Sequence, residues 1–184
     1  AAFSDCTNLQ VVRLPKTVKK IGWLAFESCS ALEEIIIPNS VTEIEDNAFA
    51  NCTNLADVTI SEGVQTIGSS AFSGCTSLSS ITIPESVTTI KANAFNGTSL
   101  YNNTENWENN ILYIDDYLIV ANSPISGDLQ IKDGTKVIAE NAFYGFTGIK
   151  SVTIPKSLKA IGSGAFGGCT SLKEVYYSGR AADW

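Results

Sequence analysis

Short runs in which apolar and polar residues alternate recur along the chain. One run is Ile35-x-Ile37 and another is Ile81-x-Ile83, and each is followed directly by a proline. Alternation with a period of two predicts a short β-strand that buries one face. Proline lacks the N–H donor that a strand ladder needs, so it ends the strand. The same arrangement is found before Pro15, Pro38, Pro84 and Pro155.

These runs belong to a longer repeat that is marked by an Ala-Phe pair. Phe3, Phe26, Phe49, Phe72 and Phe95 are each separated by 23 residues, Phe143 follows Phe95 by 48, and Phe166 follows Phe143 by 23. A fixed period in the twenties predicts a solenoid of stacked coils. The interval of 48 is two coils' worth of chain plus two residues. The sequence therefore predicts about eight coils, of which the last is incomplete.

Each unit contains further apolar positions in the same register. A small residue or Cys stands three positions after Phe, a Leu follows, and a second alternating stretch such as "SVTTI" comes after the proline. The second stretch predicts another short extended segment, and "AFxxC" is long enough for only one helical or 3₁₀ turn. The expected fold is mostly β with short helical turns. Every coil repeats the phrase because it must present the same surface to its neighbour.

In pattern, the repeat resembles the BspA-type class of bacterial leucine-rich repeats, whose units are similar to "AFxxCxxLxxVxIPxxVxxIgxx". The resemblance covers essentially the whole chain, and the stretch from "NWENN" to "AENAF" is similar to a longer variant unit of that family. It implies a right-handed leucine-rich-repeat solenoid over residues 1–184 as a single domain, with the variant or inserted unit at about 96–134. It also implies a secreted or cell-surface bacterial protein involved in adhesion, with no catalytic motif.

Composition narrows the functions further. The formal net charge is −7, which disfavours binding to nucleic acid and to anionic membrane surfaces. No apolar run is long enough to span a membrane. The chain has no His, which removes the commonest general base and zinc ligand, so we expect neither an enzyme nor a cofactor. It also has no Met and begins within the repeated phrase, so we expect a piece of a longer secreted protein.

The five cysteines occupy one column of the repeat: Cys6, Cys29, Cys52, Cys75 and Cys169. A straight row of parallel side chains, spaced like neighbouring strands, suits neither a disulfide nor a tetrahedral zinc site. The prediction is that all five are reduced and buried as small apolar residues.

The middle position of the first strand points outward in every coil and forms the first candidate binding surface. It is Arg13, Ile36, Thr59, Thr82, Gln130, Thr153 and Tyr176. A threonine column is also ordinary β-surface chemistry, so structural filler and a binding surface both remain open. Arg13, Ile36 and Tyr176 depart from the threonine pattern and favour binding.

The variant unit is the least repetitive part of the chain. "ILYIDDYLIV" predicts a β-hairpin of residues 111–114 and 117–120, with Asp115 and Asp116 in the turn. The polar loop before it contains Tyr101 and Trp107, which are residue types favoured at binding hot spots. Together with Tyr113 and Tyr117 they form either a protein or glycan contact or the packing of the hairpin on the solenoid.

The sequence thus predicts a non-enzymatic surface module that binds a host or bacterial surface protein, or a glycan, through the curved strand face. The alternative is an architectural spacer within a longer surface protein. No catalytic, metal or cofactor residue is expected. Uncapped apolar ends predict end-to-end self-association, unless a cap forms at the C-terminus with Trp184.

Overall fold

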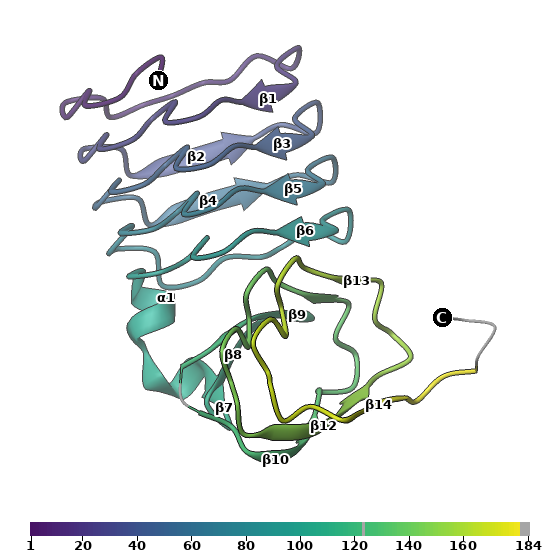
Figure 1. Ribbon diagram of the computed structural model, residues 1–184. Helices are drawn as coiled ribbons and strands as arrows, with labels where there is room; N and C mark the ends of the chain where they lie inside the picture. The colour runs from purple at the N-terminus through teal and green to yellow at the C-terminus, as the bar shows by residue number, and fades with distance from the viewer. Residues whose placement is uncertain (123, 181–184) are drawn as a thin grey trace. The chain divides into compact units, whose positions relative to one another are not determined.

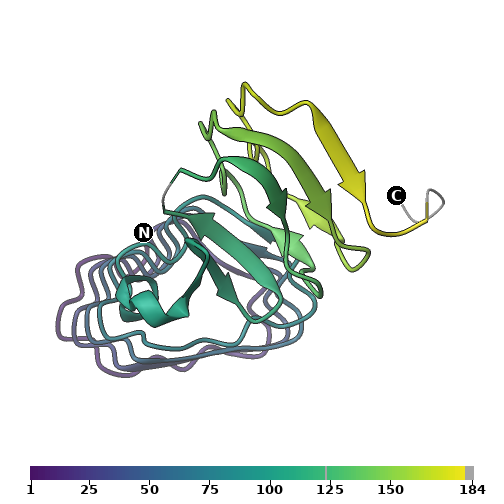
Figure 2. The ribbon, with the colours of Figure 1, turned by 90° about the horizontal axis from the view of Figure 1, so that it is seen from below.

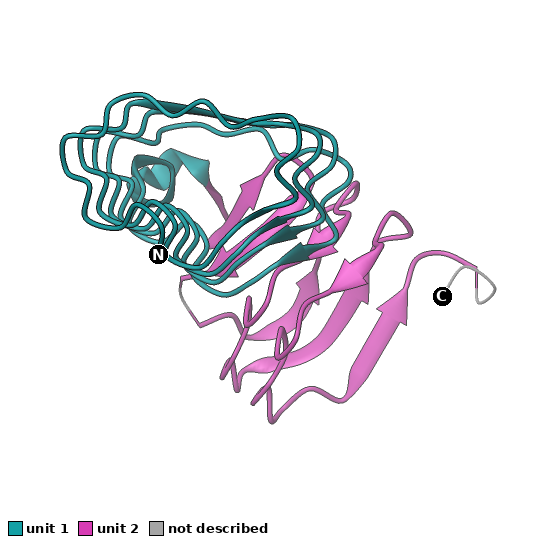
Figure 3. Ribbon diagram, turned by 90° about the horizontal axis from the view of Figure 1, so that it is seen from above, with its two compact units in different colours: residues 1–106 teal, residues 107–184 magenta. Residues whose placement is uncertain are grey.

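The computed structural model describes residues 1–122 and 124–180, so the predicted cap by Trp184 lies outside the described residues. The chain divides into two compact units, residues 1–106 and residues 107–184 (Figure 3). Each unit is described by itself below. The single continuous domain expected from the sequence therefore stays a prediction.

Unit 1 is a stack of coils held by two parallel ladders (Figure 1). One ladder has the order β1-β3-β5-β6 and the other pairs β2 with β4, and partners such as Ile44 and Ile67 are 23 residues apart. The elements of the unit are β1 (Lys20–Ile21), β2 (Glu34–Ile37), β3 (Glu43–Ile44), β4 (Asp57–Ile60), β5 (Thr66–Ile67), β6 (Thr89–Ile90), the helix α1 (Ser99–Asn102) and the 3₁₀ helix η1 (Thr104–Asn106). Both extended segments predicted for the repeat are therefore present in the two coils that contain β2 with β3 and β4 with β5.

The first strand is missing from two coils where the alternation predicted it. Residues 11–14 and 80–83 are not assigned to strands, although Ile81 and Ile83 are buried and Thr82 is exposed. In the coil after residues 80–83 the helix α1 begins, and the Leu100 N–H donates to the Leu78 carbonyl at 2.9 Å. Burial alternation therefore survives where the regular ladder does not, because α1 replaces the next strand on that side.

The Ala-Phe corner is a series of hydrogen-bonded turns and contains no regular helix. Two positions in each corner from Phe26 onward, two residues before and two residues after Phe, have left-handed backbone, and the Phe3 corner has the second of them at Asp5. Around Phe26 these are Leu24 (φ 54°) and Ser28 (φ 58°), and elsewhere they are mostly Asn or Gly. Left-handed backbone is costly for most L-residues and is tolerated by Gly, Asn and Asp. These two columns are the sequence feature that turns the chain sharply at every corner.

The corner also joins each coil to the next one. The N–H groups of Phe26 and Ser28 donate to the carbonyls of Ala48 and Ala50, both at 2.8 Å. The Phe49 N–H donates in the same way to the Ala71 carbonyl at 2.8 Å. The coils consequently follow the same outline, as the view in Figure 2 shows for unit 1.

The phenylalanines stack inside the corners. In unit 1 the ring centroids from Phe3 through Phe95 are 5.3–5.8 Å apart, with planes within 9° of parallel. In unit 2, Phe143 and Phe166 stack at 5.1 Å. Phe49, Phe72, Phe95 and Phe143 are fully buried, whereas Phe3 in the first coil is 49% exposed. This stack is the centre of the apolar core.

Four cysteines bind the backbone of the preceding coil. The thiols of Cys29, Cys52, Cys75 and Cys169 each donate to the Phe carbonyl 26 residues earlier, at 3.0–3.3 Å. All four are buried and none is in a disulfide. Burial raises the pKa of the Cys52 thiol to about 12, so it stays protonated and remains a donor at neutral pH.

The prediction that all five cysteines are buried is wrong for Cys6, which is free but exposed. The thiols of the other four cysteines each donate a hydrogen bond to the Phe carbonyl of the preceding coil, which covers them. Cys6 belongs to the first coil of the chain, and no described coil precedes it to supply that cover.

Unit 2 combines a hairpin with further repeat coils. Its sheets have the orders β13-β11-β9-β8-β7 and β10-β12-β14. The strands are β7 (Trp107–Glu108), β8 (Ile111–Ile114), β9 (Tyr117–Ala121), β10 (Gly127–Gln130), β11 (Val137–Ile138), β12 (Ile149–Ile154), β13 (Ala160–Ile161) and β14 (Glu174–Tyr177). The predicted hairpin is confirmed, with β8 and β9 antiparallel and Asp115 in the left-handed conformation (φ 49°).

Strand β9 explains the irregular interval of 48 residues. It pairs antiparallel with β8 on one side and parallel with β11 on the other, so that Leu118 faces Ile138 in the register of the second-strand ladder. Strand β10 takes the place of a first strand beside β12. The interval therefore contains repeat strands as well as the hairpin. The described residues make about seven turns with a period of about 23 residues, consistent with the prediction of about eight coils of which the last is incomplete.

The left-handed columns predict a stabilising substitution. Leu24 occupies a position that is Asn in three other coils, namely Asn47, Asn93 and Asn141. Leu24→Asn should raise the free energy of unfolding by about 0.5–1 kcal/mol in urea titrations, since Asn tolerates this conformation. Leu24→Ala is the control, because it removes the same side chain and keeps the backbone penalty. Equal stability of the two variants would contradict the role given to the conformation.

The cysteine column predicts selective chemical labelling. In native protein near neutral pH, a thiol reagent should modify Cys6 at once and leave the other four intact, as mass spectrometry of the intact chain would show. In denaturant all five should react. Cys6→Ser should abolish the fast reaction, and rapid labelling of this variant would be incompatible with the buried thiol ladder.

Candidate functional site

In unit 1, the residues at the outward position of the first strand are exposed on the molecular surface. Arg13, Ile36, Thr59 and Thr82 are all exposed, and Ile36 lies directly opposite Thr59 in the β2–β4 ladder. Ile36 is 65% exposed, although Ile35 and Ile37 on either side of it are buried. Alternation along β2 therefore exposes the large apolar side chain of Ile36 to solvent. The fold does not require an apolar residue at this position.

Ile36 borders a hollow on this face. The hollow has a volume of about 420 Å³, and its lining combines exposed apolar groups with both signs of charge: Val11, Val12, Arg13, Leu14, Lys16, Glu34, Ile35, Ile36 and Pro38. Val11 is itself 58% exposed. Apolar groups rimmed by charged residues are typical of surfaces that bind other proteins.

Unit 2 has a corresponding column in its own first strands. Gln130, Thr153 and Tyr176 are paired in register across β10, β12 and β14. Gln130 and Tyr176 are exposed and Thr153 is half-buried. The Tyr176 hydroxyl donates to Glu174 at 2.7 Å, and this hydrogen bond raises the pKa of the tyrosine. Each unit thus presents its own strand face, and the predicted residues are brought into line within each.

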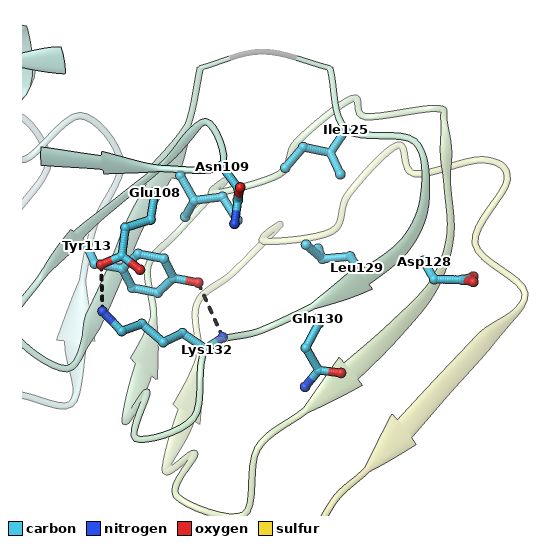
Figure 4. Close-up of a pocket in the computed structure, with 9 residues that line it drawn as sticks. Glu108, Asn109, Tyr113, Ile125, Asp128, Leu129, Gln130 and Lys132 are labelled. Carbon is cyan, nitrogen blue, oxygen red and sulfur yellow. Dashed lines mark hydrogen bonds and ion pairs between the residues drawn. The ribbon is translucent and has the colours of Figure 1, made fainter. Parts of the chain in front are cut away.

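A pocket lies in unit 2 between the hairpin and β10 (Figure 4). Its volume is about 460 Å³. The lining residues are Glu108, Asn109, Ile111, Tyr113, Ile125, Asp128, Leu129, Gln130 and Lys132. Of these, Ile111 and Leu129 are buried and most of the polar residues are exposed, so an apolar floor is surrounded by a polar rim. Gln130 connects this pocket to the strand face.

Lys132 organises one wall of the pocket. Its ammonium group contacts Glu108 Oε1 at 2.6 Å and lies 5.3 Å from the centre of the Tyr113 ring, and its backbone N–H donates to the Tyr113 hydroxyl oxygen at 3.4 Å (Figure 4). Burial raises the pKa of Tyr113, and the Glu108 carboxylate raises it further. The Tyr113 hydroxyl therefore keeps its proton and can donate a hydrogen bond.

The opposite wall is polar and fixed by the neighbouring coil. Asp128 Oδ1 accepts a hydrogen bond from the Ser151 hydroxyl at 2.6 Å. The Gln130 side chain donates to the Ile131 carbonyl at 3.3 Å. Asn109 stands at the turn between β7 and β8 in the left-handed conformation (φ 51°), and among the described residues its side-chain amide has no hydrogen-bond partner.

The aromatic residues of the variant unit do not form one site. Tyr117 is 2% exposed and packs in the core, whereas Tyr113 is half-buried in the pocket wall. Tyr101 is half-buried in α1 of unit 1, and Trp107 is half-buried in β7 of unit 2. Tyr117 therefore serves to pack the core, which is one of the two roles that the sequence left open for these aromatic residues. Tyr113 is the aromatic residue of the set that lines a cavity.

Sequence reasoning missed most of the polar pocket residues, namely Glu108, Asn109, Asp128 and Lys132. Among the residues that the structure describes, no group of three His, Cys, Asp or Glu side chains could hold a metal ion. The useful signal was the Asn109-Asn110 pair, which marks a tight hairpin turn because Asn tolerates positive φ.

Trp23 is another exposed residue of unit 1, and the repeat pattern in the sequence did not mark it as a candidate. It is 57% exposed beside a small cavity of about 140 Å³ that is also lined by Glu43, Glu45, Asp46 and Lys91. Lys91 contacts Asp46 at 3.0 Å.

Within the described part of the chain, no helix is long and apolar enough to cross a membrane.

Comparison with known families identifies the repeat. The family described as BspA type leucine rich repeat region matches residues 1–125 and 114–182, in six copies. The chain belongs to this family, as the resemblance of its repeat predicted. Membership supports a protein-interaction or adhesion module in general terms, and the family is generally non-enzymatic.

Solved structures of bacterial leucine-rich repeat proteins are similar to the chain. A leucine rich cell surface protein from Faecalibacterium prausnitzii A2-165 is 28% identical, with a TM-score of 0.46, and the match covers 93% of this chain and 32% of that one. A leucine-rich repeat protein from Bacteroides ovatus ATCC 8483 is 26% identical, with a TM-score of 0.49 and coverage of 96% and 56%. The pneumococcal vaccine antigen PcpA is 25% identical, with a TM-score of 0.46 and coverage of 86% and 42%.

The chain thus spans between about a third and just over half of the length of these structures. No curated protein matches the chain significantly.

The burial of the aromatic residues predicts which of them stabilise the fold. Tyr117→Ala should lower the free energy of unfolding by about 3 kcal/mol or more, because it leaves a large cavity in the core. Tyr176→Ala, at an exposed position, should change it by no more than about 0.5 kcal/mol. Urea unfolding of both variants measures the difference, and similar losses would contradict the assigned roles.

Proposed function

We propose that the chain is a non-enzymatic binding module of a secreted or cell-surface protein, and that it binds a protein partner through the outward face of its first strands. The observation that most supports this is the exposure of Ile36. The inward positions of β2 are apolar because they form the core, but nothing in the fold requires an isoleucine on its outer face.

The chemistry around Ile36 supports a protein partner. Arg13 and Glu34 line the same hollow, and arginine is among the residue types enriched at binding hot spots. The net charge of −7 makes nucleic acid and anionic lipid unfavourable partners. In unit 2 the corresponding column ends at Tyr176, which is again exposed and of a hot-spot type.

The alternative function is an architectural spacer with no ligand of its own. A spacer needs only a soluble outer face, and the threonines at positions 59 and 82 would serve that purpose. The replacement of threonine by arginine, isoleucine and tyrosine within one column favours binding over spacing. Family membership supports a secreted or cell-surface location for this module.

The proposal predicts saturable binding that depends on this face. The chain would be tested in solid-phase assays against immobilised extracellular-matrix proteins and glycans. Ile36→Ser and Thr59→Glu should each weaken binding about tenfold or more, because a central apolar contact is lost or a charge is buried.

Thr88→Glu is the matched control for Thr59→Glu. Both threonines are exposed in unit 1, and Thr88 lies next to the second strand instead of the first. Binding that is lost equally in Thr59→Glu and Thr88→Glu would place the contact off the strand face. Absence of binding by every form of the chain would favour the spacer.

A further inference from the structure

We infer that the pocket beside the hairpin in unit 2 is a separate binding site for a small neutral saccharide. This inference does not rest on the proposed binding of a protein by the strand face. The volume of the pocket, about 460 Å³, falls in the range of about 300–1,000 Å³ that is usual for small-molecule sites.

The arrangement of polar groups suits a ligand that both donates and accepts hydrogen bonds. Asn109 has a side-chain amide with both functions, and no described residue uses it. Among the described residues, the amide oxygen of Gln130 likewise accepts no hydrogen bond, since this side chain only donates through its nitrogen to the Ile131 carbonyl. The protonated Tyr113 hydroxyl adds a donor. Hydroxyl groups of a sugar can satisfy all three groups.

The apolar floor suits the other surface of a sugar ring. Ile111 and Leu129 are buried beneath the pocket, and Ile125 is half-buried at its side. A pyranose ring presents C–H groups on its faces and hydroxyls at its edge, so it can cover apolar side chains while its edge contacts the rim. A purely apolar ligand would leave the rim amides without hydrogen bonds, which is costly.

The charges favour a neutral ligand. Glu108 and Asp128 are opposed by the single ammonium of Lys132, so the pocket has a small excess of negative charge that disfavours an anion. Both carboxylates already have partners, since Glu108 contacts Lys132 at 2.6 Å and Asp128 accepts from Ser151 at 2.6 Å. A cationic peptide would have to displace these contacts, whereas a neutral saccharide would leave them intact.

The site is supported on rigid elements, which suits recognition of a small ligand. Residues 111 and 113 belong to β8, which is paired on both sides with β7 and β9. Residues 128, 129 and 130 belong to β10, which is paired with β12. Binding therefore costs little additional ordering of the chain.

The test is a titration followed by two-dimensional amide NMR. The probes are N-acetylglucosamine and galactose as neutral sugars, N-acetylneuraminic acid as an anionic sugar, and a short oligolysine peptide. The expected result is saturable shifts of residues lining the pocket with at least one neutral sugar, and weaker shifts or none with the other two probes.

Two matched variants test the location. The double variant Asn109→Gly with Gln130→Ala removes both rim amides, and glycine keeps the left-handed backbone at position 109. It should weaken binding about tenfold. Thr170→Ala is the control, because Thr170 is exposed in unit 2 and belongs neither to the pocket lining nor to the outward column of the first strands. Its affinity should be unchanged, and unaltered amide spectra elsewhere would show that both variants are folded.

The inference is overturned if neither neutral sugar shifts the pocket resonances, if the anionic sugar or the peptide binds there more tightly, or if the double variant and Thr170→Ala bind equally well. The strand-face proposal is tested in unit 1 with other variants, so either proposal can fail while the other stands.

Discussion

The fold depends on keeping every coil in register with the one beside it. Adjacent coils are joined by backbone hydrogen bonds at the corner, such as Phe26 to Ala48, and by the parallel ladders, in which Ile44 faces Ile67. A shift by one residue would turn each buried strand residue to the outside, since side chains alternate between the faces of a strand. The period of 23 follows from this constraint. The stacked phenylalanines and the thiols bound to Phe carbonyls are further consequences, because they require identical positions to lie above one another.

The register also explains where the chain can vary. Inward positions contact the neighbouring coils, so they are confined to a few apolar residues. Outward positions such as Ile36 contact no neighbouring core, so their identity is free to serve another purpose. A larger departure is possible only where the ladder is restored afterwards. The variant unit satisfies this condition, because β9 closes the hairpin and at the same time pairs with β11. Residues of the hairpin region and of β10 then line the pocket in unit 2.

The core and the outward surface are therefore formed by different residues of the same strands. In β10, Leu129 belongs to the core while Gln130, on the other face, is exposed. In β2, Ile35 and Ile37 are buried while Ile36 faces solvent. Substitutions on the outer face can change binding without a large loss of stability, because exposed positions contribute little to the folding energy.

The sequence by itself determined the repeat, the alternation that forms the extended segments of most coils, and the hairpin at Asp115, because these depend on local alternation and on turn residues that act within a few positions. It also indicated which strand residues face outward, and Ile36 and Thr59 are exposed as expected. Only the tertiary structure decided that residues 80–83 form no regular strand, that Cys6 is exposed, that Tyr117 belongs to the core, and that Lys132 meets Glu108 and Tyr113 in one pocket. These features depend on contacts between segments that are distant in the sequence or on the presence of a neighbouring coil. Periodicity predicts which residues repeat, but contacts across the fold decide what covers each of them.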